Sequence, residues 1–123
     1  MYVSIFILTH DYVFQVIQRR LDGSVDFFKT WNEYKIGFGD VTGEFWLGNE
    51  YISDITSSNY DYVLRIELTS YNGEKRFAEY SHFSVGTSEY DYKLHVGSYL
   101  SGSNAGEHKC TRKDSVNTVT YIT

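Results

Sequence analysis

The chain has 123 residues, enough for one domain with a modest core, and its hydrophobic and charged fractions, 41% and 22%, are those of an ordinary globular protein. A formal net charge of −5 argues against a nucleic-acid backbone as partner, since proteins that bind one usually carry a basic patch. Aromatic residues are frequent at 18% and proline is absent, so turns must depend on Gly, Asn, Asp and Ser.

The chain begins with an apolar run, residues 2–8, which we interpret as a β-strand. The run has neither the basic flank nor the small-residue cleavage site of a signal peptide, and a membrane span needs about 20 apolar residues. Residues 12–20 are rich in β-forming side chains, and Asp22-Gly23 after them predicts a tight turn. We therefore expect two strands at the start of the chain.

Two short helices are expected in the next part of the chain. The first is indicated by three aromatic residues spaced to share one helical face: Phe27, Trp31 and Tyr34. Asp26 is its expected N-cap, and Gly37 or Gly39 its expected end. The second helix is expected to have Asn49 as its cap and to place three residues on one face: Tyr51, Ile52 and Ile55.

Three consecutive antiparallel strands are expected between residues 62 and 96. Residues 62–68 alternate between apolar and polar side chains, which is typical of a half-buried strand. Asn72-Gly73 favours a hairpin turn with two positive φ angles, after which residues 75–85 return as the partner strand. Residues 90–96 alternate too, with four side chains expected to face inward: Tyr90, Tyr92, Leu94 and Val96. Helices followed by paired strands indicate an α+β fold in one domain.

Four blocks of sequence between residues 16 and 50 carry a family resemblance: VIQRR, DGSVDF, YKIGFG and GEFWLGN. In this order and spacing they resemble the fibrinogen C-terminal domain, which occurs in fibrinogen chains, ficolins, tachylectins, tenascins and angiopoietins. The resemblance continues through LRIEL, FAEYSHFSVG and YKLHVGSY, and it fades after SGSNAG at residues 101–106. It covers most of this chain but only about half of a full family domain.

The resemblance implies a fibrinogen-like fold in which a central antiparallel sheet carries short flanking helices and the C-terminal half is missing. Residues 1–106 would form the partial domain, and residues 107–123 a divergent, disordered tail. Trp46 is expected to fill core space where Gly43 and Gly48 let backbone segments approach it. Nine residues are expected in the structural core: Trp31, Tyr34, Phe38, Phe45, Trp46, Leu64, Ile66, Phe83 and Leu94.

Several family features are not recognisable in this sequence. The first family disulfide would precede VIQRR, where residues 1–15 stand instead, and Cys110 matches no family cysteine, so we expect a free thiol or an intermolecular pair. Asp114 lies in a stretch similar to the start of the family's calcium loop, but alone it cannot supply six to eight oxygens, so no cofactor is expected. The chain is expected to be a fragment, an incomplete gene prediction or a truncated paralogue, poorly soluble through unpaired sheet edges.

No catalytic or metal-binding motif stands out among the remaining polar residues. His82 and His95 are expected to be surface residues on neighbouring strands rather than metal ligands. Glu44, beside Trp46, is interpreted as a structural hydrogen-bond acceptor at a helix junction rather than an acid catalyst. Three arginines are expected to pair with carboxylates (Glu67, Glu79 or Asp26) rather than with an anionic ligand: Arg19, Arg20 and Arg65.

The resemblance implies a secreted, non-enzymatic recognition module of the lectin-like, innate-immune type that binds glycans or other surface ligands. Its site would be weak and multiplied by oligomerisation through regions outside this chain. The alternative is a matrix or receptor-ligand protein, similar to tenascins or angiopoietins, whose partners are extracellular or cell-surface proteins. An enzyme is the third and least favoured hypothesis. Secretion is implied by the family alone, and no ligand-binding residue can be assigned from the sequence.

Overall fold

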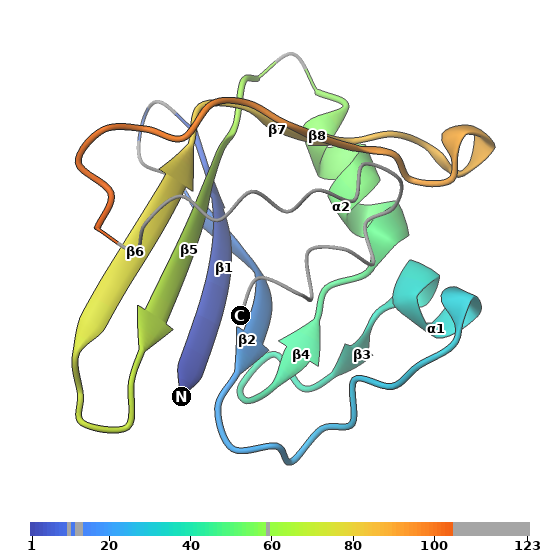
Figure 1. The fold of residues 1–123 in the computed structure, drawn as a ribbon. Helices are drawn as coiled ribbons and strands as arrows, with labels where there is room; N and C mark the ends of the chain where they lie inside the picture. The colour runs from blue at the N-terminus through green and yellow to red at the C-terminus, as the bar shows by residue number, and fades with distance from the viewer. Residues whose placement is uncertain (10, 12–13, 59, 105–123) are drawn as a thin grey trace.

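A six-stranded antiparallel sheet forms one layer of the molecule, and two helices and a two-stranded ribbon cover one of its faces (Figure 1). The computed structural model describes residues 1–9, 11, 14–58 and 60–104. In spatial order the sheet contains β3 (Phe38–Gly39), β4 (Phe45–Trp46), β2 (Phe14–Arg20), β1 (Tyr2–Leu8), β5 (Val63–Thr69) and β6 (Lys75–Tyr80). The other elements are α1 (Trp31–Ile36), α2 (Asn49–Thr56), β7 (Phe83–Val85), the 3₁₀ turn η1 (Ser88–Tyr90) and β8 (Leu94–Val96). The expected α+β fold is confirmed.

The apolar run at the start of the chain is a strand and lies inside the sheet. β1 pairs with β2 from Val3–Arg20 to Leu8–Phe14, and on its other side it pairs with β5 along its whole length. The interpretation of this run as a strand is therefore confirmed. The edges of the sheet are β3 and β6, and residues 99–104 bond to the outer side of β6. The expectation of a bare sheet edge is wrong for β6.

A β-bulge in β2 accounts for two adjacent buried residues. Ile5 lies opposite Gln18 and Phe6 lies opposite Val16, so Ile17 is an extra residue with no partner in the register. Both Ile17 and Gln18 are buried, although neighbours in a regular strand would point to opposite faces. The bulge thus turns one more apolar side chain toward the helices.

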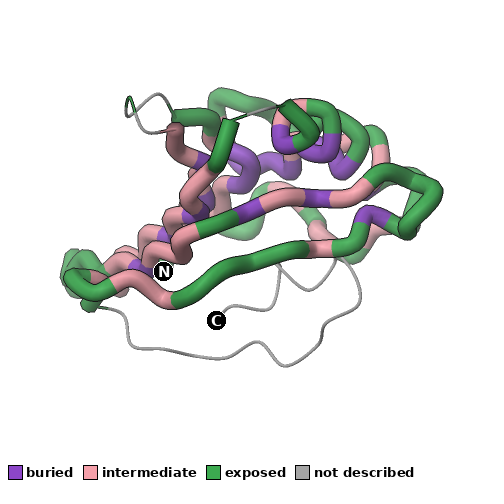
Figure 2. The backbone as a smooth tube through the Cα atoms, turned by 90° about the horizontal axis from the view of Figure 1, so that it is seen from above, coloured by how far each residue is buried: buried purple, intermediate pink, exposed green. Residues whose placement is uncertain are grey.

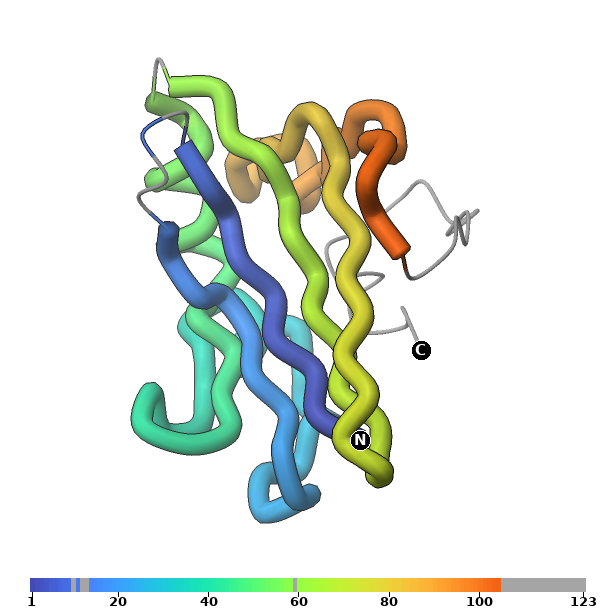
Figure 3. The backbone as a smooth tube through the Cα atoms, turned by 90° about the vertical axis from the view of Figure 1, so that its left-hand side faces the viewer, coloured from blue at the N-terminus to red at the C-terminus, as the bar shows by residue number. Residues whose placement is uncertain are grey.

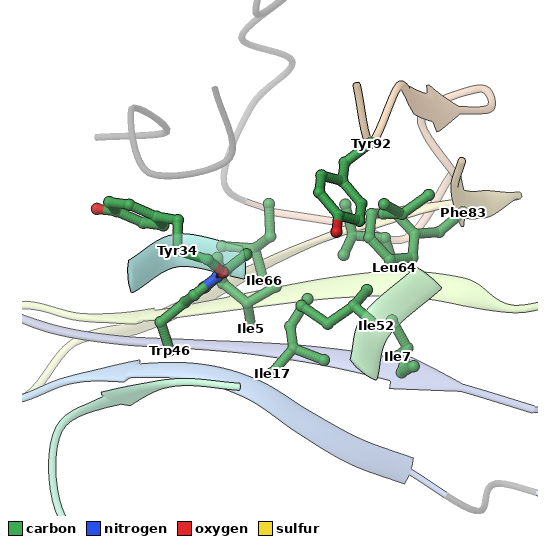
Figure 4. Packing of buried hydrophobic residues seen from close by; sticks show 11 residues of the cluster. Ile5, Ile7, Ile17, Tyr34, Trp46, Ile52, Leu64, Ile66, Phe83 and Tyr92 are labelled. Atoms are coloured by element: carbon green, nitrogen blue, oxygen red, sulfur yellow. Dashed lines mark hydrogen bonds between the residues drawn. The ribbon is translucent and has the colours of Figure 1, made fainter. Parts of the chain in front are cut away.

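The core lies between the sheet and the elements that cover it. Figure 2 shows the buried residues gathered where the strands and α2 face each other, and Figure 4 shows their packing. The cluster contains eleven buried residues: Ile5, Ile7, Ile17, Tyr34, Trp46, Ile52, Leu64, Ile66, Phe83, Val85 and Tyr92. Phe45 is also buried, and its register partner Arg19 holds its guanidinium 5.5 Å from the ring centre. Phe38 and Leu94 are partly buried against the cluster.

Trp31 is the exception among the nine expected core residues, because it is 42% exposed. The expected helix over Phe27, Trp31 and Tyr34 begins later than predicted, at Trp31, so Phe27 is not on its face. Thr30 is the N-cap in place of Asp26. Its hydroxyl accepts from the Glu33 amide at 3.2 Å while its own amide donates to the Glu33 carboxylate, which is a capping box.

A glycine occupies one end of each helix. Gly37, with φ of +96°, ends α1, which settles the choice between the two expected glycines. Gly48 occupies the N-cap position of α2, so the prediction of Asn49 as cap is wrong, and Asn49 is the first helical residue. Of the three residues expected on one face of α2, Ile52 is buried but Tyr51 is exposed.

The expected three-stranded ribbon between residues 62 and 96 is wrong in its second half. β5 and β6 form the predicted hairpin, but only Gly73 of the Asn72-Gly73 pair has a positive φ, and its amide closes the turn onto the Ser70 carbonyl at 3.0 Å. The return strand breaks after β6, and β7 leaves the sheet to pair with β8. Tyr90 and Val96 are exposed instead of inward, whereas Tyr92 is buried.

Several expectations concern parts of the chain outside the described residues. These are the proposed tail, residues 107–123, and the expectations for Cys110 and Asp114 within it. Among the helices of the described ranges, none has the length and apolar character needed to cross a membrane.

Candidate binding surface

The junction between α1 and α2 is built around Trp46. Its indole N–H donates to the Tyr34 carbonyl and to the Asn49 side-chain oxygen, both at 3.0 Å, which satisfies the polar atom of a fully buried ring. A side chain at Gly37 would bring its Cβ within 2.6 Å of the Leu47 carbonyl oxygen. A side chain at Gly48 would lie at the same distance from the Ile36 carbonyl oxygen. The backbone segments therefore pass at a separation that only glycine allows.

Gly43 does not share this role, although the sequence suggested it. A Cβ at Gly43 would meet only the Asp40 carbonyl oxygen, at an ordinary 3.9 Å. Gly39 makes the close contact instead, since its Cβ would lie 2.3 Å from the Glu44 carbonyl oxygen. The aromatic ring and the glycines thus fix where α1 and α2 stand relative to the sheet.

Glu44 holds the loop after β2 in place. Its buried carboxylate accepts four backbone N–H groups at 2.6–3.0 Å, from Leu21, Asp22, Gly23 and Val25. Burial alone would raise the pKa of this carboxyl, but the four donors together outweigh it and lower the pKa from 4.5 to about 2. The interpretation of Glu44 as a structural acceptor is confirmed, although it binds a loop and not a helix junction.

α1, α2 and the loop that contains η1 meet at Tyr92. Its ring is fully buried and lies against Trp31, with 5.9 Å between ring centres, and its hydroxyl donates to the Glu50 carboxylate at the start of α2. Burial first, and then the hydrogen bond and charge of Glu50, raise the pKa of Tyr92 to about 12. Tyr92 stays protonated at neutral pH and joins three segments that are distant in sequence.

The backbone around Tyr92 is strained. Asp91 and Tyr92 have φ of 53° and 52°, so two successive residues other than glycine adopt the left-handed conformation. The loop is closed by the Gly86 amide, which donates to the Lys93 carbonyl at 2.8 Å, and by the Tyr92 amide, which donates to the Thr87 carbonyl at 3.1 Å. Strain of this kind persists where surrounding structure holds it, and it is frequent at binding sites.

Each of the three segments that meet at Tyr92 carries an exposed aromatic residue. We call these three residues the aromatic surface: Trp31 on α1, Tyr51 on α2 and Tyr90 on η1. Their exposed fractions are 42%, 57% and 70%. The same segments carry exposed carboxylates, namely Glu50, Asp54, Glu89 and Asp91. The exposed rings and carboxylates of these segments offer aromatic and negatively charged groups to a partner.

The other charged residues singled out in the sequence have structural partners. Arg65 pairs with Glu67 at 2.8 Å and with Glu79 at 3.0 Å, as expected. Arg19 donates to the carbonyls of Val41 and Gly43 instead of pairing with a carboxylate. Arg20 also departs from the expectation, because its guanidinium lies 4.3 Å from the centre of the Phe27 ring.

The two described histidines lie near the β7–β8 ribbon. His82 contacts the Asp61 carboxylate at 2.6 Å, and His95 lies in β8 opposite Ser84. Within the described ranges, no group of three or more His, Cys, Asp and Glu side chains could hold a metal ion.

The sequence did not reveal the aromatic surface. Tyr92 was expected to be buried in a strand, and nothing in the residue types predicts two left-handed residues before β8. The sequence also does not indicate that Glu50 binds Tyr92, because the two residues are 42 positions apart. The alternation of residues 90–96 indicated burial of Tyr92 correctly but not the exposure of Tyr90.

Comparison with known proteins identifies the class. The family model for the C-terminal globular domain of fibrinogen beta and gamma chains matches residues 4–121. The chain therefore belongs to the fibrinogen C-terminal domain family, as the sequence blocks indicated.

Individual members of the family show how similar this chain is to known proteins and how much of them it covers. Human angiopoietin-2 is 48% identical over 81 residues, which are 66% of this chain and 16% of that protein. Bovine fibroleukin is 49% identical over 84 residues, which are 68% of this chain and 19% of that protein. The solved fibrinogen-like globe domain of human ANGPTL6 is 43% identical and superposes with a TM-score of 0.70, covering 74% of this chain and 40% of the globe. The chain thus spans less than a fifth of these two relatives and two fifths of the solved globe.

Proposed function

We propose that this chain is a secreted, extracellular binding module of the receptor-ligand type, which recognises a cell-surface or other extracellular protein without catalysis. The observation that carries the assignment is the similarity to angiopoietin-2 and to the ANGPTL6 globe. This similarity favours the receptor-ligand alternative over the glycan-binding lectin. Because the chain spans only part of these proteins, the activity of the whole protein is also part of what we propose.

The aromatic surface is the part of the described structure that best fits protein recognition. Trp and Tyr are the residues most enriched where protein interfaces concentrate their binding energy. Trp31 is backed by Tyr92, which in turn is fixed by Glu50, so the ring is held in one position before a partner arrives. The carboxylates around it favour a partner that presents Lys or Arg. We therefore place the contact with the partner at Trp31, Tyr51 and Tyr90.

The binding partner can be sought with the purified chain on two arrays, one of cell-surface receptor ectodomains and one of glycans. We expect binding to at least one receptor ectodomain. The Trp31→Ala/Tyr90→Ala variant should then bind at least about 30-fold more weakly, because two central aromatic contacts are lost. Circular dichroism verifies that the variant keeps its fold.

Tyr71→Ala is the matched control, because Tyr71 is 96% exposed but lies at the tip of the β5–β6 hairpin. We expect it to leave binding unchanged. Binding to glycans alone would favour the lectin hypothesis instead, and an equal loss in both variants would remove the aromatic surface as the contact.

A further inference from the structure

The outer edge of β6 is bonded by a segment that is not a strand. We call residues 99–104 the strap, and Figures 1 and 3 show it running beside β6. The backbone amides of Leu100 and Asn104 donate to the carbonyls of Glu79 and Phe77 at 2.8 and 3.0 Å. In return, the Phe77 amide donates to the Asn104 side-chain oxygen at 2.7 Å, and the Glu79 amide donates to the Ser103 hydroxyl at 2.9 Å. Two side-chain oxygens thus take the place of the carbonyls of a neighbouring strand.

The strap occupies the position of a neighbouring strand, but it does not form the regular hydrogen-bond ladder of one. Tyr99 forms an isolated bridge with Tyr80, and their rings lie 5.8 Å apart. Gly102 then turns the strap with a φ of +96°, and no atom of the described residues lies within 4 Å of the position that a side chain would take here. The strap therefore satisfies the edge of β6 through a few polar contacts and one ring contact. An unprotected strand edge is a template for pairing with another chain.

The charges along the edge of β6 are complementary to those of a second β6 strand paired antiparallel with it. Phe77 and Glu79 direct their amides and carbonyls away from β5 toward the strap, and the alternation of a strand gives Lys75 the same direction. If two copies of β6 pair antiparallel about a two-fold axis at Phe77, Phe77 lies opposite Phe77 of the other copy. Lys75 of each copy then lies opposite Glu79 of the other. Opposite charges at directly facing positions stabilise a strand pair.

The residues between these positions also fit the paired arrangement. In the same register, the long Arg76 side chain faces the small Ala78 of the other copy. Phe77 is covered on its own chain by the Arg65 guanidinium, 4.1 Å from the ring centre. A two-fold contact of this kind uses the same patch on both partners and closes as a dimer.

We propose that the strap covers a homotypic interface, and that its displacement lets two copies of this chain join β6 to β6 in one continuous antiparallel sheet. The strap thereby keeps the chain monomeric in the fold described above. The interface is separate from the aromatic surface, so it does not depend on the binding function proposed for that surface.

Sedimentation velocity on the full chain over a wide range of concentrations tests this inference. All variants carry Cys110→Ser to prevent unrelated disulfides. Ser103→Ala/Asn104→Ala removes both side-chain acceptors from the strap. We expect the parent to be monomeric and the association constant of the dimer to be at least about tenfold higher in this variant. Adding Lys75→Glu places carboxylates opposite each other and should restore the monomer. Lys93→Glu, an equal charge change at an exposed loop residue, should not.

Covalent trapping tests the register. Facing residues in a hydrogen-bonded antiparallel pair have Cα atoms about 5.5 Å apart, within the range of a disulfide. Phe77→Cys in the strap variant should therefore form a symmetric disulfide on oxidation, and Tyr71→Cys at the hairpin tip should not. A folded strap variant that stays monomeric, or a dimer that is indifferent to Lys75→Glu, would overturn the inference.

A peptide experiment replaces these variants if they fail to fold. A synthetic peptide with the sequence of β6, titrated into the parent chain, should shift the NMR signals of the Phe77 and Glu79 amides. The same peptide with Lys75→Glu should bind at least about tenfold more weakly. If neither peptide shifts these two amides, the β6 edge is not a homotypic interface.

Discussion

The junction between α1 and α2 is held by close backbone contacts, whereas the loop between β7 and β8 is anchored to the two helices through the buried side chain of Tyr92. At the junction, Gly37 and Gly48 bring two backbone segments together beside Trp46, so several constraints reinforce one another. In the loop, two left-handed residues are held by backbone hydrogen bonds within the loop and by the ring and hydroxyl of Tyr92. The first region should therefore resist motion and tolerate no added atom, while the second should open when one residue is changed.

The largest effect is expected from Gly48→Ala. The new Cβ would lie 2.6 Å from the Ile36 carbonyl oxygen, at a φ of +114° that side chains disfavour. We expect a loss of about 3–5 kcal/mol in the free energy of unfolding, measured by denaturant titration. Gly73→Ala is the control, since Gly73 also has a positive φ but no atom within 4 Å, and it should cost about 1 kcal/mol. If both variants lost the same free energy of unfolding, the close backbone contact at Gly48 would not be what stabilises the junction.

The next effect is expected from Tyr92→Ala. Loss of a buried aromatic ring costs about 3 kcal/mol, and here it also removes the anchor of a strained loop. Hydrogen exchange at the Gly86 amide, which bonds to Lys93, should become much faster than exchange at the amides of β5. Tyr90→Ala, at an exposed neighbour, should change neither stability nor exchange. If hydrogen exchange became equally faster at the amides of the sheet, the loop would not open independently of the sheet.

A smaller effect is expected from Glu44→Gln. The four backbone donors would lose a charged acceptor, at a cost of about 2 kcal/mol at neutral pH. Since the pKa of Glu44 falls from 4.5 to about 2 on folding, its contribution is complete above pH 4.5 and declines as the pH falls toward 2. The difference in unfolding free energy between parent and variant should shrink over that window. Glu89→Gln, at an exposed carboxyl, should show no such trend.

The smallest effect is expected from Tyr92→Phe, which keeps the ring and removes the hydroxyl bonded to Glu50. We expect a loss of about 1 kcal/mol. The pKa of Tyr92 rises from 10 to about 12 on folding, so its contribution is complete below pH 10 and is lost as the pH rises to 12. Ultraviolet titration of tyrosinate should show a late-titrating group in the parent chain that is lost in the variant. A parent chain without that group would show that Tyr92 is not enclosed.

The strands and the junction could be predicted because their local signals agree with their tertiary contacts. The alternation in residues 62–68 matches the buried side of β5, and the aromatic and glycine blocks match the packing around Trp46. The α1 cap is also present in the sequence as Thr30 and Glu33, three residues apart, but the placement of Phe27 on the helical face predicts Asp26 instead.

The ribbon and the surfaces could not be predicted because they depend on contacts between distant segments. Residues 75–85 look like one strand, yet the chain leaves the sheet at Ser81 and His82, where Gly97 packs closely against both residues. Trp31 is exposed because the start of α1 turns it outward, which its spacing from Tyr34 does not reveal. The strap cannot be predicted from the sequence either. Ser103 and Asn104 are ordinary loop residues by type, and their bonds to β6 become visible only in the structure.

The central position of β1 has a consequence for synthesis of the chain in the cell. Residues 2–8 leave the ribosome before β5 and can form a hairpin with β2, but β5, their other neighbour, is made only after both helices. At about 5–20 residues per second, one side of β1 stays open for seconds during translation. The nascent hairpin therefore exposes an apolar strand to other chains and to chaperones until residue 69 has emerged.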